Sequence, residues 1–308
     1  MGSVCRRRII AVKKEVERHG VTGDFLFDAP SVRRLVRLAI EEDLPAGDVT
    51  AALTIDPEDC GRATVVAREA LIVCGVPLVG VVFREFGWEV AVEAVVAEGS
   101  RVTAEAPLVR LAGSTRHLLA AERIVLNFLQ RLSGVATGVR RVVDAAHGIT
   151  VLDTRKTTPG WRLLEKYAVR VGGGANHRGS LSDMVLVKNN HIAAHRGSVR
   201  DTLRRVFAAK PIYLPVEVEV RSLTELEEAL EFDVAVIMLD NMPTALIAAA
   251  LQRIRAVKSQ LPVEVSGGIT PERFPELARA GVTLVSMGAL TTQAVNVDIS
   301  MRLEGGVR

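Results

Sequence analysis

The second half of the chain constrains the fold most, because short apolar runs alternate there with amphipathic helical stretches. Six strand-like runs cover residues 150–154, 183–188, 215–220, 234–239, 262–267 and 282–288. Helical spacing of apolar residues falls near 161–171, 197–209, 222–231, 243–258 and 271–280. Strands that alternate with helices form parallel sheets with right-handed crossovers. Because six strands fall short of eight, the pattern predicts an α/β fold with an incomplete (β/α) barrel.

A doubly wound parallel sheet is the alternative architecture for this half. No G-x-G-x-x-G string follows the first predicted strand, which disfavours a dinucleotide-binding fold.

The first half follows a different pattern. Residues 31–42 carry apolar side chains at helical spacing with Ser31 as the expected N-cap, and residues 43–50 are expected to be a loop. Between residues 61 and 111 the chain reads as short β-rich runs, including ALIVCGVPLVG at 70–80. Its last stretch has the rhythm of a carrier domain but contains no lysine to modify. A helix is expected over residues 115–132.

Composition excludes several classes of protein. A net charge of +3 is too small to indicate a nucleic-acid partner. The longest apolar run is short and interrupted by glycine and proline, so no membrane span is expected. The basic start of the chain has no apolar segment behind it, unlike a secretory signal. The three cysteines show no metal or redox spacing, so we expect reduced thiols in a cytoplasmic protein.

Polar residues at the ends of the predicted strands are sorted by charge. The working residues of a (β/α) barrel lie at the C-terminal ends of its strands. The first two ends carry cations, in Asp153-Thr154-Arg155-Lys156 and Lys188-Asn189-Asn190-His191, and the next two carry Glu219 and Asp240. The last two carry Ser266-Gly267-Gly268 and Met287-Gly288-Ala289. Lysine is otherwise rare in the chain, so this sorting predicts one functional site.

These residue types indicate distinct duties. Glycine turns before helices let backbone N–H groups approach a phosphate. Glu219 and Asp240 suit Mg²⁺ or ribose hydroxyls, and they suit a sugar carbon that becomes cationic. Arg155, Lys156, Arg178 and Lys188 suit carboxylates or pyrophosphate; Arg178 belongs to a glycine-rich loop over 171–180 that is expected to face the ligand. His191 is expected to cap a helix or orient a neighbour. Taken alone, Glu122 and Arg123 are a charged pair on a solvated helix face.

Eight strings resemble the quinolinate phosphoribosyltransferase family, and the resemblance runs from about residue 30 to 302. They are EEDLPAGDVT (41–50), AERIVLNFLQRLSGVAT (121–137), LDTRKTTPGWRLLEKYAVRVGGGANHR (152–178), LVKNNHI (186–192), VEVEV (216–220), IMLDNM (237–242), EVSGGIT (264–270) and SMGALT (286–291).

The resemblance implies an α/β sandwich domain over residues 29–132, which the chain end at 292–308 rejoins, and an incomplete α/β barrel over 133–291. Residues 1–28 are left as an N-terminal extension. It also implies at least a homodimer with shared active sites. The implied reaction joins quinolinate to phosphoribosyl pyrophosphate, with Mg²⁺, and gives nicotinate mononucleotide, pyrophosphate and CO₂.

The resemblance further implies roles for individual residues. Arg123 matches the arginine that reaches into the neighbouring subunit's site, in place of the solvated pair. The basic pocket matches Thr154, Arg155, Lys156, His177, Arg178 and Lys188, and the ribose and metal carboxylates match Glu219 and Asp240. The 5′-phosphate cradle matches Ser266, Gly267, Gly268, Met287, Gly288 and Ala289. Lys156, Glu219 and Asp240 are the expected catalytic residues.

Three alternatives stay open on the sequence. One is a related phosphoribosyltransferase, or a molybdenum-transport-associated relative, that uses a different aromatic acid. Another is a Schiff-base barrel lyase that uses Lys188, and the third is a non-catalytic carrier or binding protein. Asn189 and Gly179-Ser180 depart from the family pattern beside the basic pocket, which bears on substrate choice.

Overall fold

The structure is a computed structural model that describes residues 26–304. The chain forms two compact units. The first, the sandwich unit, comprises the chain up to Gly138 together with Thr158–Gly172 and the chain from Gln293 onwards. The second, the barrel unit, comprises Val139–Thr157 and Gly173–Thr292. Most of the N-terminal extension expected from the sequence lies outside the described residues.

The barrel unit is built on a six-stranded sheet in the order β6-β11-β10-β9-β8-β7, with every pairing parallel. Its strands are β6 (Thr150–Leu152), β7 (Val185–Val187), β8 (Val216–Val220), β9 (Val236–Asp240), β10 (Val263–Ser266) and β11 (Leu284–Ser286). In the described chain β6 and β7 are the two edges, so the sheet is not a closed eight-stranded ring. The predicted α/β class and incomplete barrel are confirmed.

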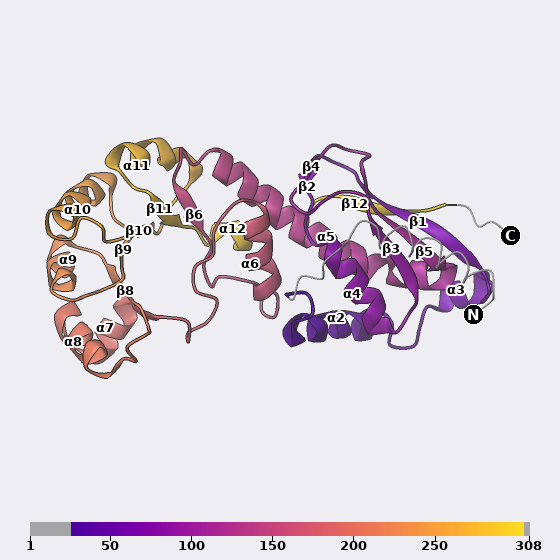
Figure 1. Ribbon diagram of the computed structural model, residues 1–308, viewed down its shortest axis with the longest axis horizontal. Coiled ribbons are helices and arrows are strands. Elements are labelled where there is room, and N and C mark those ends of the chain that lie inside the picture. Colours follow the sequence, from indigo (N-terminus) through magenta and orange to yellow (C-terminus); the bar gives the residue numbers. More distant parts are fainter. Residues whose placement is uncertain (1–25, 305–308) are drawn as a thin grey trace. The chain divides into compact units, whose positions relative to one another are not determined.

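Helices follow the strands as the periodicity predicts. They are α7 (Asn189–His195), α8 (Val199–Ala209), α9 (Leu223–Leu230), α10 (Thr244–Val257), the 3₁₀ turn η2 (Pro271–Arg273), α11 (Phe274–Ala280) and the short α12 (Ala289–Thr292). Figure 1 shows α8 to α11 arranged along the outer side of the strands. Strand β8 is buried at every position, as expected of a parallel strand covered on both faces.

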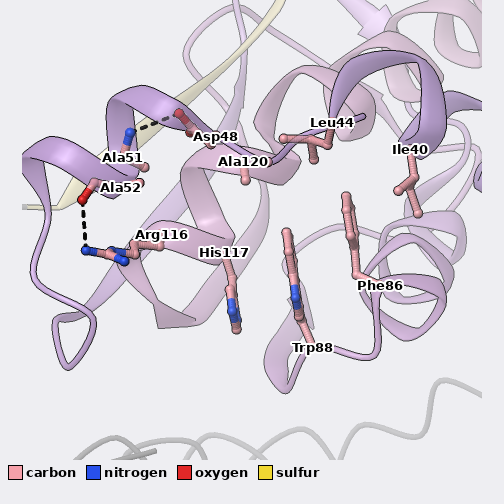
Figure 2. Close-up of a pocket in the computed structure, with 11 residues that line it drawn as sticks. Ile40, Leu44, Asp48, Ala51, Ala52, Phe86, Trp88, Arg116, His117 and Ala120 are labelled. Atoms are coloured by element: carbon pink, nitrogen blue, oxygen red, sulfur yellow. Dashed lines mark hydrogen bonds between the residues drawn. The ribbon is translucent and has the colours of Figure 1, made fainter.

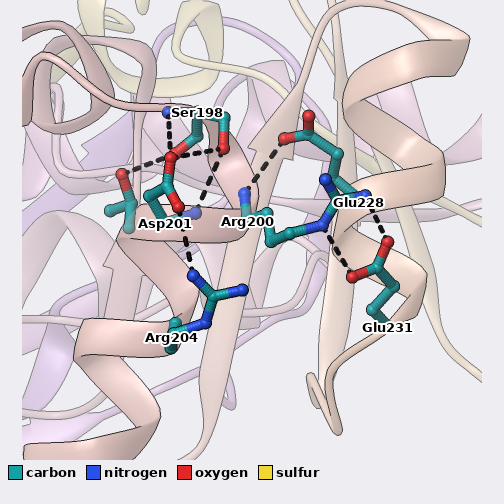
Figure 3. A network of polar contacts seen from close by, with 7 residues as sticks. Ser198, Arg200, Asp201, Arg204, Glu228 and Glu231 are labelled. Carbon is teal, nitrogen blue, oxygen red and sulfur yellow. Dashed lines mark hydrogen bonds and ion pairs between the residues drawn. The ribbon is translucent and has the colours of Figure 1, made fainter.

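Polar contacts at helix ends tie α8 to α9. The Ser198 hydroxyl accepts the Asp201 N–H at 3.1 Å, while Asp201 Oδ2 accepts the Ser198 N–H at 3.3 Å, a capping box. Arg200 Nε donates to Glu231 Oε2 at 2.7 Å, and the Arg200 N–H donates to Glu228 Oε2 at 3.0 Å (Figure 3). The capping box therefore fixes the start of α8, and exposed polar contacts reach from there to α9.

The sandwich unit contains a four-stranded antiparallel sheet in the order β12-β1-β5-β3 and a two-stranded pair of β2 and β4. The strands are β1 (Cys60–Ala67), β2 (Leu71–Ile72), β3 (Val90–Ala94), β4 (Arg101–Val102), β5 (Pro107–Ser114) and β12 (Ile299–Glu304). The helices are α2 (Pro30–Asp43), α3 (Val49–Thr54), α4 (Val76–Phe86), α5 (Thr115–Asp144) and α6 (Arg162–Val171). Strand β12 pairs with β1, so the end of the chain completes this sheet.

Two local predictions for this unit are wrong. Helix α2 begins at Pro30 with Ala29 as N-cap, not at Ser31, because proline is well suited to the first helical position. The predicted β-rich run at 70–80 holds only two strand residues before it becomes α4. Gly75 adopts φ 100°, which ends the extended segment, and buried side chains then surround the helix. An apolar run buried on all sides does not distinguish strand from helix.

Two smaller expectations also fail. Helix α3 forms at the end of the predicted loop, because the Asp48 carboxylate accepts the Ala51 N–H at 2.9 Å and caps it. Cys74 is a free and buried thiol as expected, whereas Cys60 is disulfide-bonded. The third cysteine lies outside the described residues. None of the helices between residues 26 and 304 is both long and apolar enough to cross a membrane.

Candidate active site

A cavity of about 520 Å³ opens where the strands of the barrel unit end. Its lining residues are Thr154, Arg155, Lys156, His177, Arg178, Leu186, Lys188, Met238, Asp240, Asn241, Ser266, Gly267, Gly268 and Ser286. Most of the residues singled out from the sequence therefore meet in one place, although they are spread over more than a hundred positions. Glu219 and Met287–Ala289 are not in the cavity wall, and Arg123 belongs to the sandwich unit.

The two-residue repeat of β-strands explains why these side chains share a face. The strand registers align Glu219 with Met238 and Met238 with Glu264 across β8, β9 and β10. Two residues further along, Ser266 aligns with both Asp240 and Ser286. Since alternate side chains of a strand point to the same face, each row contributes to the cavity side of the sheet. The Ser286 hydroxyl donates to Ser266 Oγ at 2.9 Å, which links neighbouring strands at the rim.

The cationic part of the wall is formed by Arg155, Lys156, Arg178 and Lys188. Burial lowers the pKa of Arg178, and the nearby charge of Arg155 lowers it further. One Arg178 guanidinium nitrogen donates to the Met184 carbonyl at 3.2 Å. The two guanidinium groups repel one another across the cavity, and a bound anion would reduce this repulsion.

The carboxylates at the next two strand ends have different surroundings. Glu219 is buried, and its Oε2 lies 3.2 Å from Lys188 Nζ while Oε1 accepts the Asn189 N–H at 3.5 Å. Asp240 is part-exposed, and its Oδ2 accepts the Asn241 amide N–H at 2.7 Å. Glu219 therefore supports the lysine from behind, while Asp240 faces the cavity.

Two glycine turns around the cavity leave little room for a side chain. Gly267 has φ 84°, and a Cβ there would overlap Asn241 Oδ1. At Gly288 a Cβ would lie 2.6 Å from Lys156 Cδ, so the turn before α12 passes close to that side chain. The Thr291 hydroxyl donates to the Lys156 carbonyl at 2.6 Å and holds the same two segments together. Met287 to Ala289 thus act on the site through Lys156.

His191 fulfils the capping role predicted for it. Its Nδ1 accepts the Lys188 N–H at 2.9 Å at the first turn of α7. The contact fixes the backbone of Lys188, whose side chain reaches the cavity wall.

A buried polar layer behind the cavity was not fully identified from the sequence. Asp153 is completely buried and accepts the Asn176 amide N–H at 2.6 Å and the His177 N–H at 2.9 Å. Glu217 and Glu264 are also buried, and their side chains approach the His177 ring. The signal for the two glutamates was present, because each precedes a predicted site residue by two positions on the same strand face.

The same layer contains the one group of three side chains within residues 26–304 whose ligand atoms are spaced for a metal ion. The atoms of His177, Glu217 and Glu264 lie within 4.8 Å of one another. Burial, and secondly the charge of Glu217, raise the pKa of Glu264 to about 7. The predicted metal carboxylates, Glu219 and Asp240, do not belong to this group, and of the two only Asp240 lines the cavity.

A second cavity, of about 370 Å³, lies within the sandwich unit (Figure 2). Trp88 stacks between Phe86 and His117, with ring centroids 3.8 and 4.3 Å apart. Arg116 lines this cavity, but its guanidinium donates to the Ile55 and Ala52 carbonyls. The sandwich cavity therefore offers aromatic surface and an engaged cation, whereas the barrel cavity offers several cations to an anionic ligand.

Comparison with known proteins gives the same assignment for both halves of the chain. The model of the "Quinolinate phosphoribosyl transferase, C-terminal domain" matches residues 135–302, and that of the N-terminal domain matches residues 48–133. A rice protein named nicotinate-nucleotide pyrophosphorylase [carboxylating], chloroplastic, is 36% identical over 289 residues, which are 89% of this chain and 78% of that protein. A Synechocystis protein, named a probable nicotinate-nucleotide pyrophosphorylase, is 38% identical over 267 residues, covering 86% and 90% of the two chains.

Solved structures agree with the sequence relatives. The crystal structure of NadC from Streptococcus pyogenes has a TM-score of 0.83 at 36% identity, covering 92% of this chain and 98% of that one. The nicotinate-nucleotide pyrophosphorylase from Francisella tularensis has a TM-score of 0.81 at 35% identity, covering 90% and 98%.

Proposed function

The chain belongs to the quinolinate phosphoribosyltransferase family, and from this premise we propose how its barrel cavity carries out the family's reaction. The enzyme transfers the phosphoribosyl group of phosphoribosyl pyrophosphate to quinolinate with decarboxylation, which forms nicotinate mononucleotide for NAD biosynthesis. The observation that carries the proposal is that Arg155, Lys156, Arg178 and Lys188 line the same cavity as Asp240 and the glycine turn at 267–268.

The reaction depends on positioning and charge more than on proton transfer. The lone pair of the pyridine nitrogen attacks C1 of the ribose while the bond from C1 to the pyrophosphate oxygen breaks, and pyrophosphate leaves with that electron pair. The nitrogen is then quaternary and stabilises the electron pair left on the adjacent ring carbon when its carboxylate departs as CO₂. A proton from solvent completes the product. The site must therefore hold two carboxylates, a pyrophosphate and a 5′-phosphate.

The four cations are suited to the anionic groups of both substrates. Arg155 and Arg178 bind the carboxylates of quinolinate, since a guanidinium can form two parallel hydrogen bonds to a carboxylate. The lowered pKa of Arg178 supports this role, because an anion would offset its burial and the repulsion from Arg155. Lys188 adds a third cation, and Lys156 supplies a point charge to the departing pyrophosphate, where negative charge develops.

Glu219 and Asp240 act on the ribose and on the metal. Asp240 lines the cavity and offers carboxylate oxygens, which Mg²⁺ prefers, and Glu219 on the neighbouring strand β8 would add a second donor in exchange for its contact with Lys188. When bound, the ion would offset the charge of the pyrophosphate leaving group. Independently of the metal, negative charge beneath the sugar stabilises its oxocarbenium-like transition state.

The glycine turns at the last two strand ends receive the 5′-phosphate. Gly267 and Gly268 have φ values of 84° and 60°, a conformation in which successive backbone N–H groups can converge on an anion. Ser266 adds a hydroxyl at the cavity rim. The Met287–Ala289 turn supports the cradle through its close contact with Lys156.

We further propose a homodimer in which Arg123 of each copy completes the cavity of the other. Its side chain is exposed on α5, a helix whose neighbouring positions are largely buried. Mixing Arg123→Ala with Lys188→Ala protomers tests the arrangement, because a hybrid dimer contains one intact site. Restored turnover is expected, and two inactive variants that stay inactive after subunit exchange would exclude a shared site.

Product analysis tests the assignment as a whole. With phosphoribosyl pyrophosphate and Mg²⁺, quinolinate is expected to give nicotinate mononucleotide and an equal amount of CO₂, and nicotinate is expected to be a poor substrate. Lack of CO₂ with quinolinate would refute the function. The Schiff-base alternative fits the geometry poorly, because Lys188 is ion-paired with Glu219 and not placed in an apolar pocket.

We also propose that the enzyme works in the cytoplasm. Both substrates carry several negative charges and do not cross lipid bilayers unaided, so the enzyme must share their compartment. Fractionation of cells followed by an activity assay tests this.

A further inference from the structure

The cavity wall is supported from behind by a buried cluster of one histidine and two carboxylates. Nε2 of His177 lies 3.1 Å from Glu217 Oε2 and 3.6 Å from Glu264 Oε2. Each glutamate side chain is only 2% exposed, and the histidine side chain is 9% exposed. Glu217 comes from β8 and Glu264 from β10, so the cluster joins two strands that are not neighbours to the loop before β7.

Both ring nitrogens of His177 are engaged within the protein. Nδ1 accepts the N–H of Arg178 at 2.6 Å. A ring nitrogen that accepts a hydrogen bond carries no proton, so the ring proton lies on Nε2 and is directed at Glu217. The main-chain N–H of His177 donates to Asp153 Oδ1, which fixes the residue from a third side.

We propose that Glu217 and Glu264 are positioning residues that orient the His177 ring, and that His177 in turn fixes Arg178 for binding a substrate carboxylate. The inference rests on the proposed function and identifies the residues that position Arg178 in that site. It also revises the expectation from the sequence that His177 binds substrate through its own charge, because neither ring nitrogen is left to do so.

The orphan oxygens of the cluster support this interpretation. Within the described residues, Oε1 of both Glu217 and Glu264 is buried without a hydrogen-bond partner. Leaving such atoms unsatisfied destabilises a fold, and buried polar groups of this kind are found where function requires them. A cluster that served stability alone would be expected to satisfy every oxygen.

The main alternative is that the two carboxylates act only through their negative charge. This alternative predicts a change of opposite sign in KM for quinolinate. Replacing a buried carboxylate by an amide removes negative charge behind the cations. If the carboxylates only weakened the positive potential of the cavity, Glu217→Gln would lower the KM for the quinolinate dianion. If they orient His177, the same substitution loosens Arg178 and raises that KM.

The test measures KM for each substrate in Glu217→Gln, Glu264→Gln, His177→Asn and the double variant Glu217→Gln/His177→Asn. Asparagine retains an acceptor near the Nδ1 position but is too short to reach the carboxylates. We expect Glu217→Gln to raise KM for quinolinate about tenfold, the scale seen when a residue behind a functional side chain is lost, with KM for phosphoribosyl pyrophosphate changed by less than about twofold. In the His177→Asn background it should have no further effect.

The matched control is Glu98→Gln in the sandwich unit. Glu98 is a part-buried carboxylate that accepts the Gly75 and Val76 N–H groups at 3.0 and 2.7 Å, so its loss lowers stability without reaching this cluster. It is expected to leave KM for quinolinate unchanged. An unchanged or lowered KM in Glu217→Gln, or equal effects in both backgrounds, would overturn the inference.

A spectroscopic measurement separates this inference from the proposed function. In full-length enzyme labelled with ¹⁵N-histidine and assigned through His177→Asn, the His177 ring at pH 8 should show Nε2 protonated and Nδ1 unprotonated. This holds whether or not quinolinate is turned over. A ring protonated on both nitrogens, or a stoichiometric metal ion that is lost in His177→Asn, would refute the positioning role.

Discussion

The two units of the molecule each bury carboxylates, but they satisfy them differently. Glu165 in the sandwich unit is fully buried, and its oxygens accept hydrogen bonds from Arg131 at 2.6 Å and from the Thr158 N–H and hydroxyl at 3.0 and 2.9 Å. Glu217 and Glu264 in the barrel unit are almost as buried, yet one oxygen of each has no partner there. The first carboxylate is neutralised by an arginine, whereas the other two crowd a single histidine.

The difference shows how to separate stability from function among buried charges. A buried carboxylate with a full set of donors holds segments together, and its removal leaves its partners unpaired. Two carboxylates packed against one ring repel each other and lower stability, so a selective advantage other than stability must retain them. The cavities differ in the same way, since Arg116 of the sandwich unit is engaged while the barrel cations line an open site.

The largest expected effect is on turnover, in Arg178→Ala. Removing a guanidinium that binds a substrate carboxylate should lower kcat/KM by about 10³-fold, or about 4 kcal/mol, while thermal stability stays close to that of the parent. Arg204→Ala, an exposed arginine on α8, is the matched control and should leave kcat/KM unchanged. A loss in kcat/KM of less than tenfold in Arg178→Ala would contradict the role of Arg178 in binding a substrate carboxylate.

The next effect is on stability, in Glu165→Ala. The substitution leaves Arg131, whose side chain is only 20% exposed, without its carboxylate, and should lower the free energy of unfolding by about 3 kcal/mol. Urea unfolding measures it. Glu231→Ala breaks an exposed pair with Arg200 and should leave the midpoint unchanged. Equal losses in the two variants would contradict the contrast between satisfied and surface carboxylates.

The third effect is a dependence of stability on pH that comes from Glu264. Its pKa is raised from 4.5 to about 7, so the folded state binds the proton more tightly than the unfolded state. This contribution is fully present below about pH 4.5 and is lost as the pH rises through about 7, for a total on the order of 3 kcal/mol.

Glu264→Gln should remove this part of the pH dependence, because an amide does not ionise. The free energy of unfolding of parent and variant, measured by urea titration between pH 5 and 8, is expected to converge at low pH and to favour the variant at high pH. Parallel curves would show that Glu264 is ionised throughout.

The smallest effect compares adjacent glycines of the phosphate turn. Gly267→Ala places a Cβ against Asn241 and strains a left-handed residue, for an expected loss of about 2 kcal/mol in stability and a raised KM for phosphoribosyl pyrophosphate. Gly268→Ala has the same kind of backbone but meets nothing within 4 Å, so about 1 kcal/mol is expected. If Gly268→Ala raised KM for phosphoribosyl pyrophosphate more than Gly267→Ala did, the phosphate would bind at Gly268 and not beside Asn241.

The sequence by itself determined the barrel unit and most of its site. Strand and helix periodicities are local, and the ends of parallel strands meet at one edge, so Arg155, Lys188, Asp240 and Ser266 could be grouped without coordinates. The same reasoning failed for α4, because an apolar run buried on every side has no period to read, and burial is set by distant segments.

Only the tertiary structure decided what lies behind the cavity. His177 was assigned to the basic pocket, and no role was assigned to Glu217 or Glu264. The contacts of the three residues join strands that are not adjacent in the sheet to a loop far from them in sequence. Sequence spacing predicts which face of a strand a side chain occupies. It does not predict how deeply the side chain is buried or which residue it contacts. Those two properties depend on packing across the whole unit, and they distinguish a residue that binds substrate from one that positions another.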